Sequence, residues 1–116
     1  MTNVQIFGVK SSQPTRAAER FFKERRIAIQ MLDLAKKRLA PAEIKRFIDR
    51  FGLAALLDTE GTPYVDAGLK YMKMSDSDML RRVEVEPKLL RLPLVRAGNR
   101  LSFGHDEAAW QAMMMP

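Results

Sequence analysis

The sequence of 116 residues contains no cysteine. This absence excludes disulfide bonds within the chain, and it excludes any reaction in which a thiolate of this chain attacks a substrate. Histidine is nearly absent as well, since His105 is the single one. Together with Asp106 and Glu107 it does not predict a metal site, because three adjacent residues at a helix start cannot converge on one ion and no second histidine is present to help.

Long apolar stretches are also missing from the sequence. No segment approaches the roughly 18 apolar residues that a membrane-spanning helix needs. The first residues do not form the basic segment and apolar run of a signal peptide. These absences predict a protein without membrane contact, located in the cytoplasm. The length and the hydrophobic content of 47% predict a single domain over residues 1–116 with a real core.

The net charge of the chain is +6, and the charged residues are unevenly distributed along it. Residues 10–50 carry twelve Lys and Arg against five Asp and Glu, whereas residues 51–116 carry eight against nine. This pattern predicts either a basic surface for an acidic protein or polyanion, or ordinary solvated helix faces. Nucleic acid is the less favoured partner, because the aromatic residues fall at helical core spacing rather than among the charges as in a base-stacking platform. The candidate surface residues are Lys36, Lys37, Arg38, Lys45, Arg46 and Arg50.

Hydrophobic patterning predicts a strand, a helix and a second strand in the first part of the chain. Val4–Val9 is an apolar run suited to a buried strand. A helix is expected to follow, with Ser11 or Ser12 as its cap and Pro14 in its first turn. A short second strand is expected around Ile27–Met31.

Later signals predict further helices and a hairpin. A helix is expected to begin at Pro41 and to end at Gly52 in a left-handed cap, and a turn is expected at Gly61–Pro63. A second helix is expected over Ser75–Arg82. Two strands at Pro93–Arg96 and Arg100–Phe103 are expected to form a hairpin, followed by a last helix from Asp106. This order predicts an α/β fold with a small mixed sheet.

The segment Ile6–Ala18 resembles the first strand, loop and helix of the arsenate reductase (ArsC)/Spx family, usually I-Y-G-I-K-N-C-x-x-C/T-x-K-A. Three later segments are similar to the family patterns L-L-x-x-x-G-x-x-Y-x-x-L-x-L, H-P-x-L-I-x-R-P-I-V and R-L-x-V-G-F/Y-x-E. They are Leu56–Leu69, Pro87–Val95 and Arg100–Glu107. The resemblance implies a thioredoxin-like fold of the ArsC/Spx type, a small mixed β-sheet flanked by helices, with a cis bond between Leu92 and Pro93.

The departures from the family pattern concern its chemistry. Ser12 occupies the position of the reactive cysteine, and Thr15 that of the second cysteine in members with two. The arginines that hold the oxyanion in arsenate reductases of this family align with Leu92, Asp58 and Phe103 or its neighbour. Leucine or a carboxylate removes the bidentate grip of a guanidinium. The joint loss of cysteine and arginines indicates abandoned thiol chemistry.

The loop around Ser12 is the candidate binding site. A helix N-terminus beside a cation suits an anion, while the alternatives are a solvated Lys10 and a Ser12 that only caps the helix. Arg91 would replace a missing arginine by a displacement of one residue, although such a residue more often faces solvent. No residue is predicted to be catalytic, and the candidate anion or partner site consists of Lys10, Ser11, Ser12, Thr15, Arg16, Arg91 and Pro93.

Three functions follow from these observations. The leading hypothesis is a binding or regulatory protein that has lost thiol redox catalysis, since Spx proteins, which it resembles, act as adaptors on RNA polymerase. The first alternative is a glutathione-dependent, arsenate-type reductase that uses an external thiol. The second is a nucleic-acid-associated basic protein. No cofactor is expected, and glutathione enters only through the family resemblance.

Overall fold

In the computed structural model, which describes residues 3–115, the chain forms two compact units. The first unit contains the chain up to Lys37 and from Leu92 onward, and the second contains Arg38–Arg91. No helix within residues 3–115 has the length and apolar character needed to cross a bilayer. The single-domain assignment stays a prediction.

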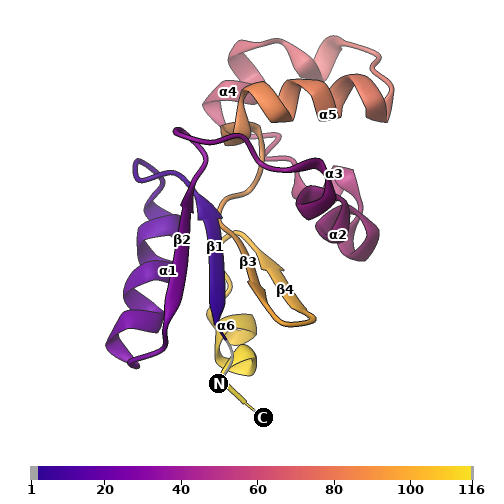
Figure 1. The fold of residues 1–116 in the computed structure, drawn as a ribbon. Coiled ribbons are helices and arrows are strands. Elements are labelled where there is room, and N and C mark those ends of the chain that lie inside the picture. The colour runs from indigo at the N-terminus through magenta and orange to yellow at the C-terminus, as the bar shows by residue number, and fades with distance from the viewer. Residues whose placement is uncertain (1–2, 116) are drawn as a thin grey trace. The chain divides into compact units, whose positions relative to one another are not determined.

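A four-stranded mixed sheet forms the centre of the first unit, in the order β2-β1-β3-β4 (Figure 1). Strand β1 (Val4–Gly8) pairs in parallel with β2 (Ile29–Asp33) and antiparallel with β3 (Leu94–Ala97). Strand β4 (Arg100–Phe103) completes the predicted hairpin with β3. The predicted small mixed sheet is confirmed.

Strand β2 begins two residues later than the apolar pattern predicts. The backbone N–H of Ile27 donates to the carbonyl of Phe22 at 3.0 Å, so that Ile27 still belongs to the turn that ends the preceding helix. Arg26 in the same turn has a positive φ of 58°. The pairing with β1 therefore starts at Ile29 opposite Val4.

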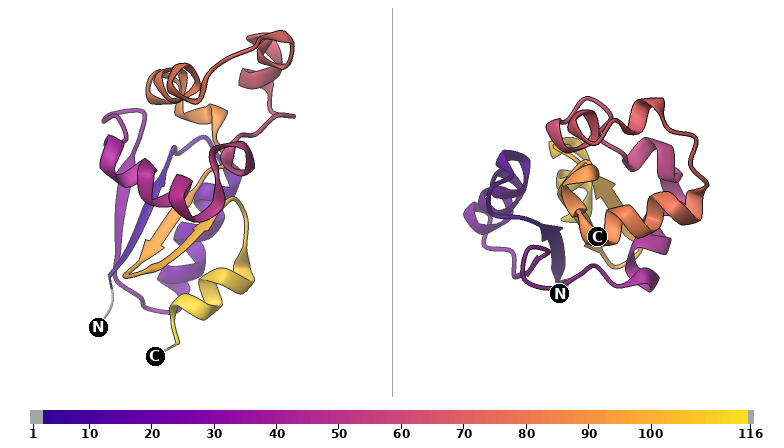
Figure 2. Two further views of the ribbon diagram at one scale, coloured as in Figure 1. Left: turned by 90° about the vertical axis from the view of Figure 1, so that its right-hand side faces the viewer. Right: turned by 90° about the horizontal axis from the view of Figure 1, so that it is seen from above.

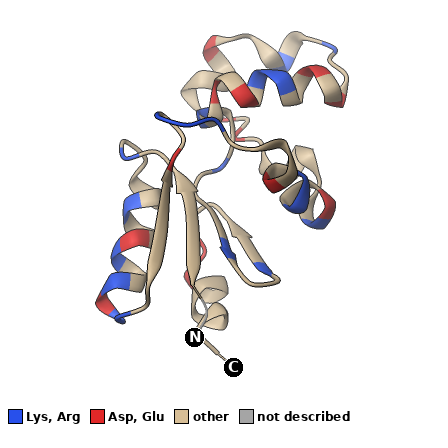
Figure 3. Ribbon diagram, viewed as in Figure 1, with Lys and Arg blue, Asp and Glu red and all other residues tan. Residues whose placement is uncertain are grey.

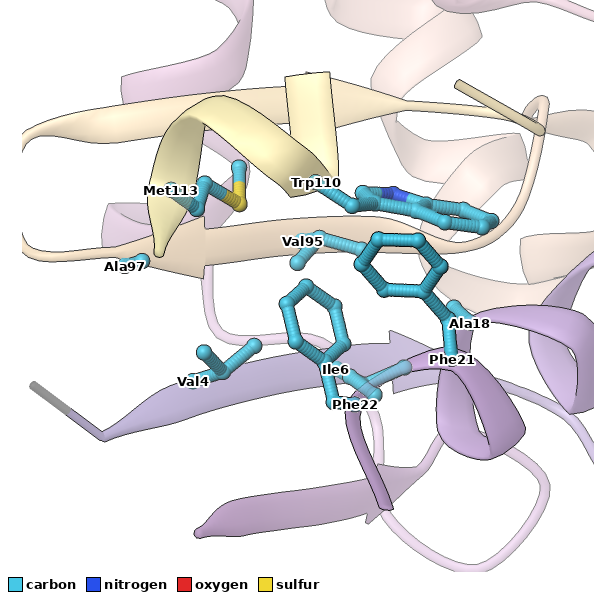
Figure 4. Packing of buried hydrophobic residues seen from close by; sticks show 9 residues of the cluster. All are labelled: Val4, Ile6, Ala18, Phe21, Phe22, Val95, Ala97, Trp110 and Met113. Carbon is cyan, nitrogen blue, oxygen red and sulfur yellow. The ribbon is translucent and has the colours of Figure 1, made fainter. Parts of the chain in front are cut away.

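Helices α1 (Gln13–Glu24) and α6 (Glu107–Met113) pack on one face of this sheet. The aromatic rings of Phe21 and Trp110 lie 5.4 Å apart between their centroids, and α6 lies against β4 (Figure 2). Figure 4 shows the buried cluster that β1, β3 and both helices share. Its members are Val4, Ile6, Ala18, Phe21, Phe22, Val95, Ala97, Trp110 and Met113.

The regular elements of the second unit, Arg38–Arg91, are α-helices and 3₁₀ turns. Its elements are α2 (Pro41–Phe51), α3 (Leu53–Leu56), α4 (Thr62–Asp66), the 3₁₀ turn η1 (Leu69–Tyr71), α5 (Asp76–Val85) and the 3₁₀ turn η2 (Pro87–Leu89). The predicted helices at Pro41 and Ser75 are confirmed, with Ser75 as the capping residue of α5. The turn predicted at Gly61–Pro63 is wrong, because Gly61 precedes α4 and Pro63 lies in its first turn, where a missing N–H costs nothing.

The cap at the end of α2 also differs from the prediction. Gly52 has the positive φ expected of it, 85°, but its ψ of 147° is not left-handed helical. The N–H of Gly52 still donates to the carbonyl of Ile48 at 2.7 Å. The chain enters α3 at Leu53 directly after this glycine, so Gly52 separates two helices rather than ending a helical region.

Candidate functional site

The loop between β1 and α1 is closed by its own backbone. The N–H of Ser12 donates to the carbonyl of Val9 at 3.0 Å. The Ser12 Oγ accepts from the N–H of Thr15 at 3.3 Å, and the Ser12 carbonyl accepts from the N–H of Arg16 at 3.1 Å. Of the two predicted caps, Ser12 is therefore the one that caps α1.

Two basic side chains belong to this loop region. Lys10 and Ser11 are exposed. Arg16, from the first turn of α1, donates through Nη1 to the carbonyl of Lys10 at 2.8 Å. Figure 3 shows the basic positions of this loop and of α1 in blue. The Arg16 guanidinium thus fixes the loop backbone and adds a positive charge to the helix N-terminus.

Thr15 faces the strand rather than the solvent. Its side chain is 1% exposed, and its Oγ1 has no hydrogen-bond partner. A Cβ at Gly8 would overlap the Thr15 side chain, so α1 approaches β1 as closely as a glycine allows. Because the N–H groups of Ser12 and Thr15 are engaged and Pro14 has none, residues 12–15 leave the N–H of Gln13 for a ligand.

Pro93 reaches the same end of the sheet. The Leu92–Pro93 bond is cis, as predicted. Phe7 pairs with Leu94 in the antiparallel ladder, so its register places Pro93 opposite Gly8, at the base of the loop. Pro93 is buried, and its carbonyl accepts from the N–H of Gly104 at 3.0 Å.

Arg91, the remaining candidate, belongs to the second unit and has a local partner. Its Nη1 lies 3.9 Å from Oδ1 of Asp58, with 44% and 38% of the two side chains exposed. Its N–H donates to the carbonyl of Leu56 at 2.7 Å. Arg91 thus lies beside an acidic side chain, and Leu92, the next residue along the chain, is buried and uncharged.

Ser12 lacks the partners of an activated nucleophile. Its hydroxyl accepts the capping bond, and within residues 3–115 no histidine or carboxylate forms a hydrogen bond with it. The imidazole of His105 lies 3.1 Å from Oε2 of Glu107 and packs on Trp110 at 5.1 Å between ring centroids. Nucleophilic catalysis by serine requires a base within hydrogen-bond reach, so the structure supports the capping role.

The proposed basic surface divides between the two units. Lys36 and Lys37 belong to the first, whereas Arg38 and the α2 residues belong to the second. On α2, Lys45 pairs with Asp49 at 2.8 Å and Arg46 lies 3.9 Å from Glu43. Part of the α2 charge is therefore compensated on the helix itself. Among the described residues, no group of histidine and acidic side chains is arranged to hold a metal ion.

Comparison with known proteins identifies the family. The family model described as ArsC family matches residues 7–113. The chain belongs to the ArsC family. The matched region includes Ser12 and contains no cysteine. The comparison with curated proteins gave no match.

Solved structures show the same fold at low identity. The YFFB protein is 16% identical and has a TM-score of 0.85, with 97% of this chain and 99% of that chain covered. An arsenate reductase from Vibrio cholerae is 19% identical, with a TM-score of 0.78 and coverage of 99% and 98%. An arsenate reductase (ArsC) related protein from Brucella melitensis is 18% identical, with a TM-score of 0.68 and coverage of 95% and 92%. These likenesses establish the thioredoxin-like ArsC fold.

Two features of this ArsC-family chain were not predicted from its sequence. One is the proximity of Arg91 and Asp58, for which the opposite charges of the two side chains were the only indication in the sequence. The other is a groove in the second unit between α4 and α5. The sequence does not predict this groove, because helix α4 spans only Thr62–Asp66 and is too short to show a repeating hydrophobic pattern.

Proposed function

We propose that this ArsC-family chain has lost thiol redox catalysis and acts by binding an anionic group of a protein partner at the loop between β1 and α1. The observation that supports the proposal is the absence of cysteine from the chain, together with the use of the Ser12 hydroxyl, which the resemblance aligns with the family's cysteine, as a helix cap. A mixed disulfide requires a thiolate, and a serine hydroxyl is not appreciably ionised near neutral pH. The proposed protein is a pseudoenzyme, because it keeps the fold of the family without a thiol for the reaction. Its proposed role is binding or regulation, and its proposed location is the cytoplasm.

The loop has the charge and the donors for weak anion binding. The N-terminal end of α1 carries positive dipole charge, and Gln13 is the first residue of this helix. Lys10 is exposed, and Arg16 in the first turn of α1 donates a hydrogen bond to the Lys10 carbonyl, so the loop and the start of the helix each contribute one cation. A phosphate or carboxylate group of a partner is the chemistry that fits these groups.

A glutathione-dependent reductase is the alternative function. In that reaction the thiol comes from outside, and the chain needs to hold only the oxyanion. Two side chains disfavour the reductase function. Leu92 is buried and apolar, and the Arg91 guanidinium lies beside Asp58. An oxyanion grip depends on guanidinium groups free to form paired hydrogen bonds.

Arsenate reduction with glutathione and glutaredoxin supplied separates these functions. We expect turnover no higher than in a control without the protein. Ser12→Cys alone is not expected to restore full activity, because it restores a thiol without the arginines. Turnover above the control that is lost in Lys10→Ala would establish the reductase alternative and refute our proposal.

Anion binding is tested by titrating the ¹⁵N-labelled chain with inorganic phosphate and recording amide shifts. We expect shifts confined to the loop over residues 10–13, weakened in Lys10→Ala and Arg16→Ala. Lys23→Ala is the matched control, since Lys23 lies on the same helix and pairs with Glu19 at 2.9 Å. Equal shifts in all variants, or no shifts in the loop, would remove the anion site from the proposal.

A further inference from the structure

Two turns of the first unit follow neighbouring strands at one end of its sheet (Figure 1). Strands β1 and β2 run parallel, and their last paired residues are Gly8 and Asp33. The N–H of Leu34 donates to the carbonyl of Gly8 at 2.9 Å, so the chain after β2 stays beside the chain after β1. The two turns are residues 9–12 and 34–37, and both belong to this unit.

Both turns carry basic side chains. Lys10 lies in the first turn, and Arg16 donates to its carbonyl at 2.8 Å. Lys36 and Lys37 lie in the second turn, which is closed because both of their N–H groups donate to the carbonyl of Asp33 at 3.1 Å. The four basic residues are exposed, and together they form the two-turn patch. Figure 3 shows basic positions of both turns at this end of the sheet.

The positive charge of the two-turn patch is little offset by carboxylates. Asp33 is the single acidic residue of segments 9–16 and 33–37, and its Oδ1 accepts a backbone N–H of its own turn at 3.0 Å. Glu19, in the next turn of α1, pairs with Lys23 at 2.9 Å. None of the four cations forms an ion pair with a residue that the structure describes. An occupant therefore meets four cations against one carboxylate.

The two-turn patch attracts anions through side chains rather than through a backbone cradle. Phosphate sites are commonly built from several converging N–H groups. Here the N–H groups of Ser12 and Thr15 are engaged, and Pro14 has none. Those of Lys36 and Lys37 bond within their own turn. Lysine ammonium groups are point charges on flexible stems, so the patch favours carboxylates distributed along a chain over one phosphate.

We propose that the two-turn patch binds an acidic segment of a partner protein, with several carboxylates distributed over its four basic side chains. This assignment rests on the proposed function, because it adds the turn after β2 to the anion loop and names carboxylates as the groups bound. Complementary charge selects such a partner and speeds its association. Nucleic acid is disfavoured, because single strands stack their bases on exposed rings, whereas Phe21, Phe22 and Trp110 of this unit are buried.

The test is a titration of the ¹⁵N-labelled full chain with two blocked synthetic peptides at about 0.1 M salt, where the Debye length of about 10 Å limits long-range attraction. One peptide carries four glutamates separated by glycine and serine, and the other has glutamine in place of every glutamate. We expect the glutamate peptide to shift the amides of residues 10–13 and 34–37 together, and the glutamine peptide to shift neither. Inorganic phosphate should bind more weakly than the glutamate peptide, because it meets fewer of the cations.

Neutralising the second turn separates this site from the anion loop alone. Lys36→Gln/Lys37→Gln should weaken the glutamate peptide about fivefold, the scale of exposed ion pairs, while phosphate still shifts residues 10–13. Lys23→Gln/Arg26→Gln is the matched control, because it removes the same charge from exposed residues at the other end of α1 and should leave the affinity nearly unchanged. Lys36→Glu/Lys37→Glu should bind a peptide with lysine in place of every glutamate more tightly than wild type does, which a misfolded variant could not do.

Four results would overturn the proposal. They are shifts of residues 10–13 without shifts of residues 34–37, equal losses in the two glutamine double variants, phosphate that binds as tightly as the glutamate peptide, and a single-stranded oligonucleotide of the same charge that binds more tightly. The third result would assign the patch to a single anion, and the last would assign it to nucleic acid. The first two leave the anion loop of the proposed function standing, whereas the absence of shifts at residues 10–13 with every anion would refute both.

Discussion

Ser12 caps the N-terminus of α1, a role for which cysteine is poorly suited. Its Oγ accepts a hydrogen bond from the N–H of Thr15, one of the helix N–H groups that lack an intrahelical partner. Sulfur is a weak hydrogen-bond acceptor. At the neighbouring contact, the methyl and hydroxyl groups of Thr15 fill the space above Gly8. Both side chains thus support the start of α1.

The close approach of α1 to β1 makes a testable prediction at Gly8. Gly8→Ala should lower the free energy of unfolding by about 1–3 kcal/mol, because the new methyl overlaps the Thr15 side chain. Thr15→Ala removes the atoms that overlap, so the double variant should recover part of this loss. Urea denaturation of the four proteins gives the coupling energy.

Gly98→Ala is the control for this cycle. Gly98 has a φ of 63°, and a methyl group added there would meet open space, so alanine strains only the backbone. Its cost should be the same with and without Thr15→Ala. A Gly8→Ala loss that Thr15→Ala does not reduce would mean that the contact does not limit the packing of α1.

At the scale of elements, α6 shows how a short helix is kept in place. It spans only Glu107–Met113, and helices of this length are marginal in water without tertiary contacts. Asp106 caps its start by accepting from the N–H of Ala109 at 3.1 Å. Arg100, on strand β4, donates through Nη1 to the carbonyls of Ala112 and Met115 at its end. Both ends and the buried Trp110 therefore hold the helix on the sheet.

Arg100→Ala should loosen α6 because it removes the donor at the carbonyl end of the helix. We expect the free energy of unfolding to fall by about 0.5–1.5 kcal/mol. Trp110 is the single tryptophan and is fully buried, so its fluorescence reports on this helix. Acrylamide should quench it more strongly in Arg100→Ala than in wild type.

Arg20→Ala serves as the comparison for Arg100→Ala, since Arg20 is an exposed arginine of α1 away from the end of α6. It should change neither stability nor quenching appreciably. Equal quenching of Trp110 in wild type and Arg100→Ala would show that packing alone retains α6.

At the scale of the whole molecule, the sheet was easier to predict than the second unit. Apolar runs such as Val4–Val9 give strands directly, and the family resemblance supplied the cis bond before Pro93. Helices α3 and α4 are too short to show a repeating pattern, and η1 and η2 are shorter still. In the candidate loop the sequence predicted the cap but not the burial of Thr15, which depends on how closely α1 packs on Gly8.

The net charge of +6 makes polyanion binding a property to test on the complete chain. Two double variants change the charge equally: Arg46→Glu/Arg50→Glu on α2 and Lys36→Glu/Lys37→Glu before it. On α2 the basic side chains lie among Glu43 and Asp49, whereas no ion pair of the described residues involves the two lysines. We therefore expect the lysine variant to lose more affinity for heparin.

The measurement is heparin affinity between 0.1 M and 1 M salt for wild type and both variants. Affinity should fall steeply, because the Debye length shrinks from about 10 Å to about 3 Å over this range. Equal losses in the two variants would show that heparin responds to net charge alone, which would leave both segments as ordinary solvated surface. A larger loss in the α2 variant would instead place the contact on α2, despite its internal ion pairs. The comparison thus separates a localised basic site from the overall charge of the protein.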